Sequence, residues 1–484
     1  MNNFRFVDLF CGGGGSITGA IDALNAAGLP YEGRGFNHWN LAIKTIQANY
    51  PEIIPDFARA CTPIEAVTPD EIFDTDPRRI DVIWASPSCT HHSVAAGGKP
   101  RSNQLRSQPE FILPYIRLTQ CRRLYIENVK ELESWGPLLD KDTIIKGKLY
   151  KAGMPDPREA GKFFNLWIRE IKASGYKVDM AYMNAADYGA ATSRERIIIQ
   201  AVRKSSGEKI VWPEPTHSRE PSLFNCKPWR SAAEIIDWSI PGESIFTRKK
   251  PLCENTLRRI EAGIEKYWGE FAEPFLIVLR GTKDKQLASS AIPVSMPLPT
   301  ITAGGEHVAL ISPIWLDLAH TKNGGVSGSV NEPLNTITCS RGTHAVISPS
   351  IRPLFVPQHG GGTVKPCDGP LSTIATTGSI GIVEPFLIDY HGTGETQNLT
   401  KPLNTIRTHD RFGLIQGQIL TMEDGRKYKL DITHRMLTAR ELAAATGFPP
   451  DYVFAGKDTD AKKQIGNAVC PCFTSALYRA FLAA

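Results

Sequence analysis

The amino-acid sequence predicts an α/β fold, built on a mainly parallel sheet and interrupted by a second region that is mainly β. Three observations support this prediction. Apolar strands alternate with amphipathic helices over residues 1–212, which is the pattern of consecutive βα units. One proline-led β pattern then recurs four times between residues 274 and 415. Residues 431–484 return to helical patterns, so the second region is expected to be an insertion.

Length and composition are those of an ordinary soluble protein with more than one domain. The 484 residues exceed a typical single domain. No apolar run is long enough for a membrane span, and the N-terminal MNNFRFVDLF lacks the plan of a secretory signal. The ten cysteines show no paired zinc-type spacing, so we expect reduced thiols and no metal site. The net charge of +5 is too small to indicate a polyanionic partner by itself.

The stretch Ile80–Ser93, IDVIWASPSCTHHS, is the one around which the chain is organised. Ile80–Ala85 has the apolar character of a central strand and ends at the breaker Ser86-Pro87. Cys89 follows directly, beyond the carboxyl end of the strand, where open α/β sheets hold ligands and reacting groups. A lone cysteine is more often an ordinary loop thiol, so its meaning depends on the rest of the chain.

The N-terminal unit combines a strand, a glycine turn and the start of a helix. Arg5–Phe10 is predicted as the strand and Gly12–Gly15 as the turn, and Ser16 is expected to cap a helix that runs to Ala27. Such a turn lets the backbone approach a nucleotide closely. A glycine turn alone does not distinguish dinucleotide oxidoreductases from methyltransferases.

The following elements continue the βα pattern. Strands are predicted over Tyr31–Phe36, Arg123–Ile126, Val178–Met183 and Ile197–Val202, and helices over Asn40–Asn49, Phe111–Leu118 and Lys162–Ala173. Glu127-Asn128 is therefore expected at the carboxyl end of a strand, one βα unit after Cys89.

A proline-rich stretch, WPEPTHSREP, breaks this pattern from Trp212 onward and predicts a domain boundary. Helices over Ser231–Ile240 and Asn255–Tyr267 are expected to bridge to the next region. There, a P-L-x-T-I pentapeptide recurs every 32–37 residues, each copy preceded by an apolar strand, which indicates one repeated supersecondary unit. The copies are Pro297–Ile301, Pro333–Ile337, Pro370–Ile374 and Pro402–Ile406.

The C-terminal segment returns to helix. Thr438 is expected to cap a helix, with Glu441 completing the capping box and Gly447 ending the helix. Gln464–Val469 is expected to open the last helix.

Four stretches, in this order, resemble the DNA cytosine-5 methyltransferase family of bacteria and phages. They are DLFCGGGGS (Asp8–Ser16), the stretch around Cys89, YIENV (Tyr125–Val129) and DYGAATSRERI (Asp187–Ile197). The resemblance implies a Rossmann-like domain that uses S-adenosyl-L-methionine (SAM), with an inserted, mainly β target-recognition domain that contains the four repeats. It assigns residues 1–212 to the first catalytic segment, 213–270 to a linker with bridging helices, 271–430 to target recognition and 431–484 to a return segment that completes the catalytic domain.

The resemblance also implies covalent catalysis. Cys89 would attack C6 of a cytosine flipped out of duplex DNA, and the methyl group of SAM would pass to C5, leaving S-adenosyl-L-homocysteine. Glu127 would neutralise charge that develops at N3, and Arg194 would donate to O2 while Arg196 supports the same loop. Removal of the C5 proton would involve water near Asn128.

Further residues take binding roles by the same resemblance. Phe10 would pack on the adenine and Gly13–Gly15 would face the methionine part. Trp39 keeps the aromatic residue of the ribose site, although the acids usual there and at Ala60–Thr62 are missing. The cofactor-binding set is Phe10, Gly13, Gly14, Gly15, Trp39, Pro87, Asn467 and Val469. The DNA-binding set is Lys99, Arg101, Arg106, Arg341, Arg407, His409 and Arg411. Ser88, Thr90 and Thr192 replace the usual proline and glutamines, which predicts an active enzyme with an altered pocket rim.

Three other functions are compatible with part of the sequence. An RNA cytosine-5 methyltransferase would use the same chemistry, but it needs no large duplex-reading insertion. A catalytically inactive DNA-binding homologue is disfavoured because Cys89, Glu127 and Arg194 are all present. A nicotinamide oxidoreductase would fit the glycine turn alone. The expected protein is a monomeric, cytoplasmic, nucleoid-associated enzyme of restriction-modification type that acts on double-stranded DNA, away from membranes.

Overall fold

The computed structural model describes residues 3–69, 79–88, 106–220, 427–484 and, with gaps, 226–301; residues 72, 92, 101 and 102 and isolated strands between 308 and 421 complete the described part. Its contacts divide the chain into two units. The first comprises residues 1–236, 295–305 and 438–484, and the second comprises residues 237–294 and 306–437. The first unit thus continues past the boundary predicted at Trp212, and it includes a short piece from within the repeat region.

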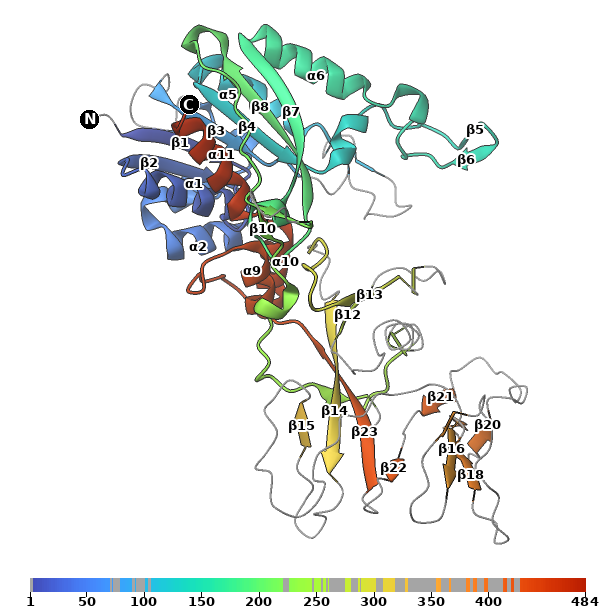
Figure 1. Ribbon diagram of the computed structural model, residues 1–484. Helices are drawn as coiled ribbons and strands as arrows, with labels where there is room; N and C mark the ends of the chain where they lie inside the picture. Colours follow the sequence, from blue (N-terminus) through green and yellow to red (C-terminus); the bar gives the residue numbers. More distant parts are fainter. Residues whose placement is uncertain are drawn as a thin grey trace. The chain divides into compact units, whose positions relative to one another are not determined.

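A six-stranded sheet forms the centre of the first unit, in the order β2-β1-β3-β4-β8-β7 (Figure 1). Strands β2, β1, β3 and β4 are parallel, and β8 is antiparallel to both of its neighbours. The strand predicted before Cys89 is β3, and it is central as expected. The strands are β1 (Phe4–Leu9), β2 (Tyr31–Phe36), β3 (Val82–Ala85), β4 (Arg123–Asn128), β7 (Tyr176–Asn184) and β8 (Glu195–Arg203).

Helices cover both faces of this sheet, as in a Rossmann-like domain (Figure 1). On one face, Ile17 of α1, Ile43 of α2 and Phe473 of α11 share one buried cluster. On the other face, Ile116 of α5 and Trp167 of α6 share a second. The helices are α1 (Gly15–Ala26), α2 (Asn40–Asn49), α5 (Ile112–Thr119), α6 (Lys162–Ala173) and α11 (Pro471–Leu482). Smaller elements of this unit are α3 (Phe57–Ala60), β5 (Thr143–Ile145), β6 (Lys148–Tyr150), β9 (His217–Ser218) and β10 (Lys227–Pro228).

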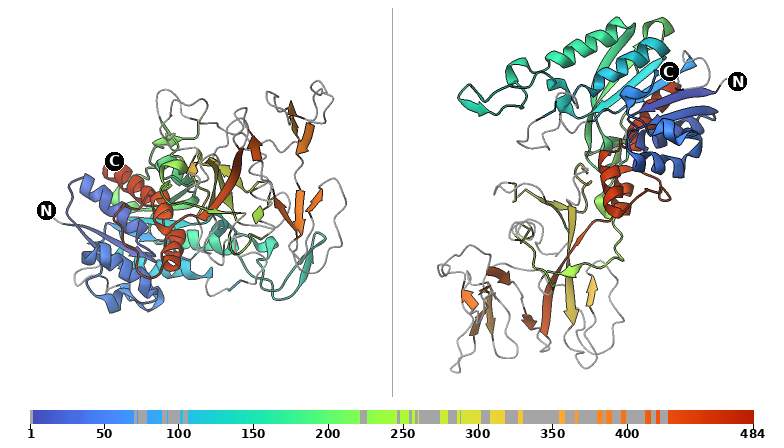
Figure 2. Two further views of the ribbon diagram at one scale, coloured as in Figure 1. Left: turned by 90° about the horizontal axis from the view of Figure 1, so that it is seen from below. Right: turned by 180° about the vertical axis from the view of Figure 1, so that it is seen from behind.

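The C-terminal segment packs back on the N-terminal one, as the sequence predicts. It contains α9 (Ala439–Thr446), α10 (Asp458–Asn467) and α11, and α11 lies along α1 in both Figure 1 and Figure 2. The predicted capping box at Thr438 is present, because Thr438 and Glu441 each bond the other's backbone N–H. One domain is therefore made from the two ends of the chain.

The contact between α1 and α11 depends on Gly19. A Cβ at this position would lie 2.1 Å from the carbonyl oxygen of Pro471, which is far inside van der Waals contact. We expect Gly19→Ala to lower the free energy of unfolding by about 2–3 kcal/mol, because the two helices must move apart. Urea unfolding followed by circular dichroism measures this loss. Gly28→Ala is the control, because a Cβ there meets nothing within 4 Å and only the backbone conformation is strained. Equal stabilities for Gly19→Ala and the unmodified protein would contradict the expectation.

The start of α1 differs from the prediction. Ser16 does not cap the helix; Gly14 does, in the left-handed conformation with a φ of 83°. Ser16 lies inside the first turn, and its hydroxyl donates a hydrogen bond to Asp8 instead. The buried carboxyl of Asp8 competes for the hydroxyl, and nothing in the local sequence signals this.

Two other helix predictions are wrong. Within the predicted helix Ser231–Ile240, only the 3-10 turn Ala232–Glu234 forms, closed by a capping box between Ser231 and Glu234. Gln464–Asn467 ends α10, and the last helix begins only at Pro471. Most of Asn255–Tyr267 lies outside the described residues.

The second unit is antiparallel β in its described part. Its main sheet has the order β11-β23-β14-β12-β13, and β17-β16-β18 and β20-β19-β21 form two smaller sheets. The four apolar stretches that precede the repeated pentapeptides are strands as predicted, namely β12, β14, β16 and β19, each with antiparallel partners. The last three pentapeptides lie outside the described residues. The strands are β11 (Glu243–Ser244), β12 (Phe275–Val278), β13 (Ala291–Pro293), β14 (Val308–Asp317), β15 (Ser327–Ser329), β16 (Leu354–Pro357), β17 (Lys365–Pro366), β18 (Ile380–Val383), β19 (Phe386–Asp389), β20 (Thr396–Asn398), β21 (Phe412–Ile415), β22 (Ile419–Thr421) and β23 (Lys427–Met436).

None of the described helices is both long and apolar enough to span a membrane.

Candidate active site

The turn that leads to Cys89 is held by neighbouring strands. The Ser86 N–H donates to Leu9 O at the end of β1. The Asn128 side-chain amide, at the end of β4, donates to Pro87 O at 2.9 Å. The Ser88 N–H donates to the side chain of Gln108 at 3.0 Å. Cys89 itself lies outside the described residues, and the structure describes the chain up to the residue before it.

Glu127 and Arg196 form a buried ion pair beside this turn. Glu127 is 6% exposed and Arg196 is 8% exposed, and Nε of Arg196 lies 3.0 Å from Oε1 of Glu127. The pair is positioned by the antiparallel ladder of β4 and β8, in which Glu127 is opposite Ile198. A carboxyl and a guanidinium are thus fixed together at the carboxyl end of β4.

Arg194 is placed differently from the prediction. Its side chain is 2% exposed, and its Nη1 donates to Ile301 O at 2.9 Å and to Gly466 O at 3.0 Å. Arg194 therefore joins the loop before β8 to two distant segments, whereas Arg196 faces Glu127. Arg196 is therefore the guanidinium beside Glu127 and Arg194 is bonded to backbone carbonyls, whereas the sequence-based assignment gave Arg194 the contact with the base and Arg196 the supporting role.

Asn128 uses both ends of its side-chain amide in backbone contacts. Its Nδ2 donates to Pro87 O, and its Oδ1 accepts from the Val129 N–H at 2.9 Å. These bonds tie the end of β4 to the turn after β3. The structure thus gives Asn128 a role in positioning the cysteine turn, and the predicted role in proton removal is not tested by these contacts.

Sequence reasoning missed Asp8, a fully buried carboxyl in the middle of the site. It accepts from the Ser16 hydroxyl, and its other oxygen, Oδ1, has no hydrogen-bond partner among the described residues. Burial raises the pKa of Asp8 from 3.8 to about 8, and the nearby charge of Glu127 acts in the same direction. The bond from Ser16 opposes this rise. The only sequence signal was the aspartate in DLFCGGGGS.

The raised pKa of Asp8 predicts that the stability of the protein depends on pH. Because its folded-state pKa lies above the unfolded value, the folded protein keeps a proton that the unfolded chain releases. The free energy of unfolding should therefore fall as the pH rises from about 4 to about 8, and this contribution should be constant above that range. Asp8→Asn imitates the protonated acid, so we expect the variant to lose less stability than the unmodified protein between pH 5 and pH 8. Urea unfolding of both proteins at the two pH values measures the difference. Identical pH profiles would show that Asp8 does not titrate in this window.

A second missed residue is Cys470, which caps α11 and is fully buried. A hydrogen bond with the Cys472 thiol lowers the pKa of Cys470, and the charges of Arg194 and Arg196 act in the same direction. The thiol of Cys470 is therefore within electrostatic reach of both arginines.

The return segment packs closely against the glycine loop. A Cβ at Gly13 would lie 3.2 Å from Cβ of Gln464, one at Gly14 would lie 2.4 Å from the Tyr452 hydroxyl, and one at Gly15 would lie 1.9 Å from Val469 O. Packing therefore already requires small residues at these three positions. Their contacts with the cofactor remain predictions. Gly12 has a φ of 52°, and a Cβ there would lie 3.9 Å from Phe10 O; this residue was not in the predicted set.

Comparisons with known proteins show similarity to DNA methyltransferases. The model of the C-5 cytosine-specific DNA methylase family matches residues 152–251 and 371–482. Over these residues, which make up less than half of its length, the chain is similar to this family. It is 37% identical over 76 residues to the type II methyltransferase M.BsuRI of Bacillus subtilis, which covers 16% of this chain and 17% of that protein. It is 27% identical over 257 residues to M.BspRI of Lysinibacillus sphaericus, covering 51% of this chain and 55% of that protein.

A third type II methyltransferase, M.AquIA of Picosynechococcus, is 28% identical over 244 residues, which covers 48% of this chain and 87% of that protein. The match thus spans less than two thirds of the first two relatives.

The aromatic residue predicted for the cofactor site, Trp39, lies at the end of β2. The Asn37 side chain accepts from the Trp39 N–H at 2.9 Å, and the Lys463 ammonium lies 4.7 Å from the Trp39 ring. Pro87 is buried, and Val469 and Asn467 lie in the return segment. These residues surround the carboxyl ends of β1 to β3, where the family's cofactor is expected.

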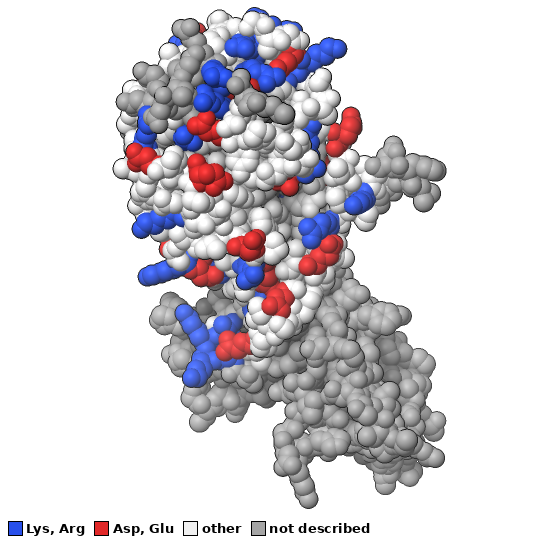
Figure 3. All heavy atoms as spheres, turned by 90° about the vertical axis from the view of Figure 1, so that its left-hand side faces the viewer, with Lys and Arg blue, Asp and Glu red and all other residues white. Residues whose placement is uncertain are grey.

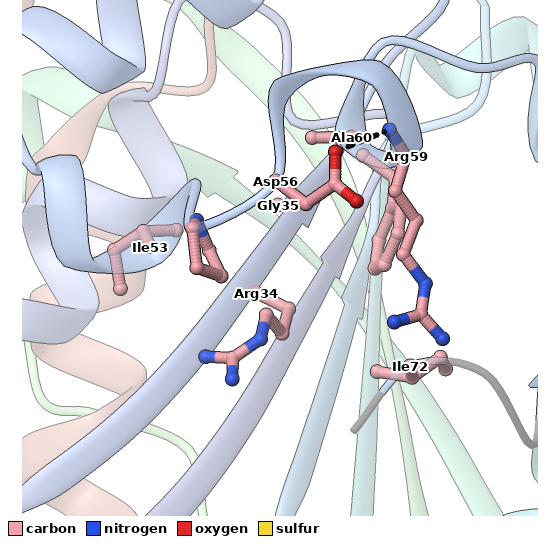
Figure 4. A pocket seen from close by; sticks show the side chains of 9 residues that line it. Arg34, Gly35, Ile53, Asp56, Arg59, Ala60 and Ile72 are labelled. Carbon is pink, nitrogen blue, oxygen red and sulfur yellow. Dashed lines mark hydrogen bonds between the residues drawn. The ribbon is translucent and has the colours of Figure 1, made fainter. Parts of the chain in front are cut away.

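A cavity of about 350 Å³ lies beside β2, bounded by Arg34, Phe36 and Ala60 (Figure 4). Ala60 occupies the position where the family resemblance leads us to expect an adenine-contacting acid. Asp56, one helical turn earlier, also lines this cavity, and its Oδ1 accepts from the Arg59 N–H at 3.2 Å. Asp56 thus places a carboxylate near the position where the acid is missing, but this carboxylate caps α3.

The predicted DNA-binding residues are only partly described. Lys99, Arg341, Arg407, His409 and Arg411 lie outside the described residues. Arg101 is half-buried, and its backbone N–H donates to Gly153 O. Arg106 is 1% exposed and donates to Gly136 O at 2.7 Å, and burial lowers its pKa to about 10. The predicted contact between Arg106 and a DNA phosphate does not fit this structure, because the guanidinium is buried and donates to a backbone carbonyl.

On the face drawn in Figure 3, the surface charge does not indicate a DNA-binding site either. There, lysines and arginines are interspersed with acidic residues over the described surface. This agrees with the small net charge of the sequence, which by itself indicates no polyanionic partner.

Proposed function

We propose that this chain is a DNA cytosine-5 methyltransferase that transfers a methyl group from SAM to C5 of a cytosine flipped out of double-stranded DNA. The single observation that supports this most is the buried Glu127–Arg196 pair beside the turn that leads to Cys89. The similarity to the family and to type II methyltransferases supports DNA as the substrate and a modification role of restriction-modification type.

The chemistry needs an activated ring, because C5 of cytosine is a poor nucleophile. The Cys89 thiolate adds to C6, which splits one hard step into two and makes C5 enamine-like. The negative charge then falls on N3 and O2 of the base. Glu127 neutralises N3 by donating a proton or hydrogen bond, and Arg196 lies close enough to Glu127 to serve O2 from the same pair.

Other residues hold this arrangement in place. Arg194 fixes the strand that carries Arg196 through its bonds to Ile301 O and Gly466 O. Asn128 fixes the turn that carries Cys89. Release of the C5 proton and departure of the Cys89 sulfur complete the cycle, and a water near Asn128 is the proposed proton acceptor.

The cofactor site fits SAM in part. Gly12, the half-buried Phe10 and Trp39 follow the carboxyl ends of the parallel strands β1 and β2, where the family resemblance places SAM. SAM supplies an electrophilic methyl group when bound. The carboxylates that the family resemblance places at the ribose and adenine are absent from Asn37–Trp39 and Ala60–Thr62, so we propose that aromatic packing contributes more here than ionic contacts.

The proposal is tested by incubating the purified chain with SAM labelled in its methyl group and with duplex DNA, RNA or no nucleic acid. We expect label in duplex DNA, recovered as 5-methylcytosine. Label only in RNA would identify the RNA methyltransferase alternative. No transfer to duplex DNA of diverse sequence, despite DNA binding, would indicate an inactive homologue.

A further inference from the structure

The first copy of the repeated pentapeptide lies against the loop that precedes β8. Leu298 and Thr192 form a parallel β-bridge, in which the Leu298 N–H donates to Ala191 O at 2.8 Å and the Ser193 N–H donates to Leu298 O at 2.7 Å. Both segments belong to the first unit. Pro297–Ile301 is thus the part of the repeat region that the structure places in the catalytic unit.

Side chains strengthen this bridge. The Thr192 hydroxyl donates to Pro299 O at 3.1 Å, and the Thr300 hydroxyl donates to Ser193 O at 3.4 Å. Thr192 and Leu298 are completely buried, and Ile301 is 5% exposed. The contact is therefore dry, and a carbonyl left without its donor there would be costly.

The bridge continues to the ion pair of the proposed active site. Ile301 O accepts from Nη1 of Arg194. Arg196 follows two residues later, and alternate residues of an extended strand face the same side. The pentapeptide therefore acts on Arg194 directly, and through the strand on the Arg196–Glu127 pair.

The four repeat copies agree with this use of the pentapeptide. Positions one, two, four and five are proline, leucine, threonine and isoleucine in every copy, and in the first copy each of these residues is buried or donates through its side chain. Position three is proline, asparagine, serine and asparagine in the four copies. In the first copy, this position supplies only its carbonyl oxygen, which any residue provides.

We propose that Pro297–Ile301 is a positioning element for catalysis, and that Thr192 and Thr300 are positioning residues that hold the strand carrying Arg194 and Arg196. This rests on the proposed methyltransferase function. The segment directly precedes the rest of the repeat region in sequence, so this element ties the start of that region to the charge-stabilising group of the reaction.

The test uses the full chain with duplex DNA and measures single-turnover methyl transfer together with the dissociation constants of SAM and DNA. We expect Thr192→Val to lower the transfer rate by about tenfold, because a small misplacement of a catalytic group is costly while ligand binding is not affected. Thr192→Ser, which keeps the hydroxyl, should restore most of the rate. Thr300→Val should lower the rate by less, because its bond is longer.

Two control variants separate this from general damage. Thr119→Val removes another fully buried threonine hydroxyl, bonded to Tyr115 O in α5, and should leave the rate within about twofold. Pro299→Asn copies the residue found in two other repeats and should do the same. A normal rate in Thr192→Val would overturn the inference while leaving the proposed function intact. Equal losses in Thr192→Ser and Thr192→Val, or a matching loss of SAM and DNA binding, would also overturn it. No transfer by the unmodified chain would instead remove the proposed function, and this inference with it.

Discussion

A Cys89→Ala variant is expected to lose methyl transfer by about 10⁴-fold or more while it still binds duplex DNA. The reason is chemical: without addition at C6, the C5 carbon is not nucleophilic enough to accept a methyl group. DNA binding should persist, because it depends on phosphate and base contacts made elsewhere. Labelled transfer and a filter-binding or mobility-shift assay measure the two properties separately.

A covalent trap makes this expectation sharper. Duplex DNA with 5-fluorocytosine at the target position cannot release its C5 substituent as a proton, so the unmodified protein and SAM should give a stable adduct at Cys89. Cys226→Ala is the matched control, because that thiol donates to Pro215 O. Cys470→Ala tests the other thiol near Arg194 and Arg196. An adduct that persists in Cys89→Ala but disappears in Cys470→Ala would transfer the nucleophilic role to Cys470.

The second large effect concerns the two arginines. Arg196→Gln is expected to lower the single-turnover rate by about 10²–10³-fold, because a preorganised charge beside the developing anion is lost. It also leaves Glu127 buried without its partner, at a cost of about 3–5 kcal/mol of stability. Glu127→Gln should lower the rate by a comparable factor, and it leaves the buried guanidinium of Arg196 without its counter-charge, so we expect a similar loss of stability.

Arg194→Gln provides the contrast. Two buried carbonyls, of Ile301 and Gly466, would lose their donor, so we expect a lower unfolding midpoint and a smaller loss of rate than in Arg196→Gln. Rate and thermal unfolding should be measured on the same preparations. A near-normal rate in Arg196→Gln together with a large loss in Arg194→Gln would restore the roles expected from sequence.

The local elements of the first unit followed directly from the sequence. The bounds of β2, α2 and α6 agree with the predicted Tyr31–Phe36, Asn40–Asn49 and Lys162–Ala173. Periodicity decides such elements because the pattern of apolar residues at two- or 3.6-residue spacing is itself the buried face. The same holds for the capping box at Thr438, whose two partners are three residues apart. Helix ends that depend on distant groups were predicted less well: Ser16 bonds Asp8, and the last helix starts at Pro471.

The motifs in the sequence also determined which chemical groups are present: a cysteine after a strand, a Glu-Asn pair at the end of another, and two arginines before a third. Only the tertiary structure decided how they are used. Arg194 and Arg196 are two residues apart and chemically identical, so their roles depend on what each one meets. One meets two carbonyls from distant segments, and the other meets Glu127. Contacts with the return segment explain why residues 13–15 are glycines, and the guanidinium of Arg106 is buried against Gly136 O. Neither could be predicted, because local spacing does not show how residues far apart in the chain pack together.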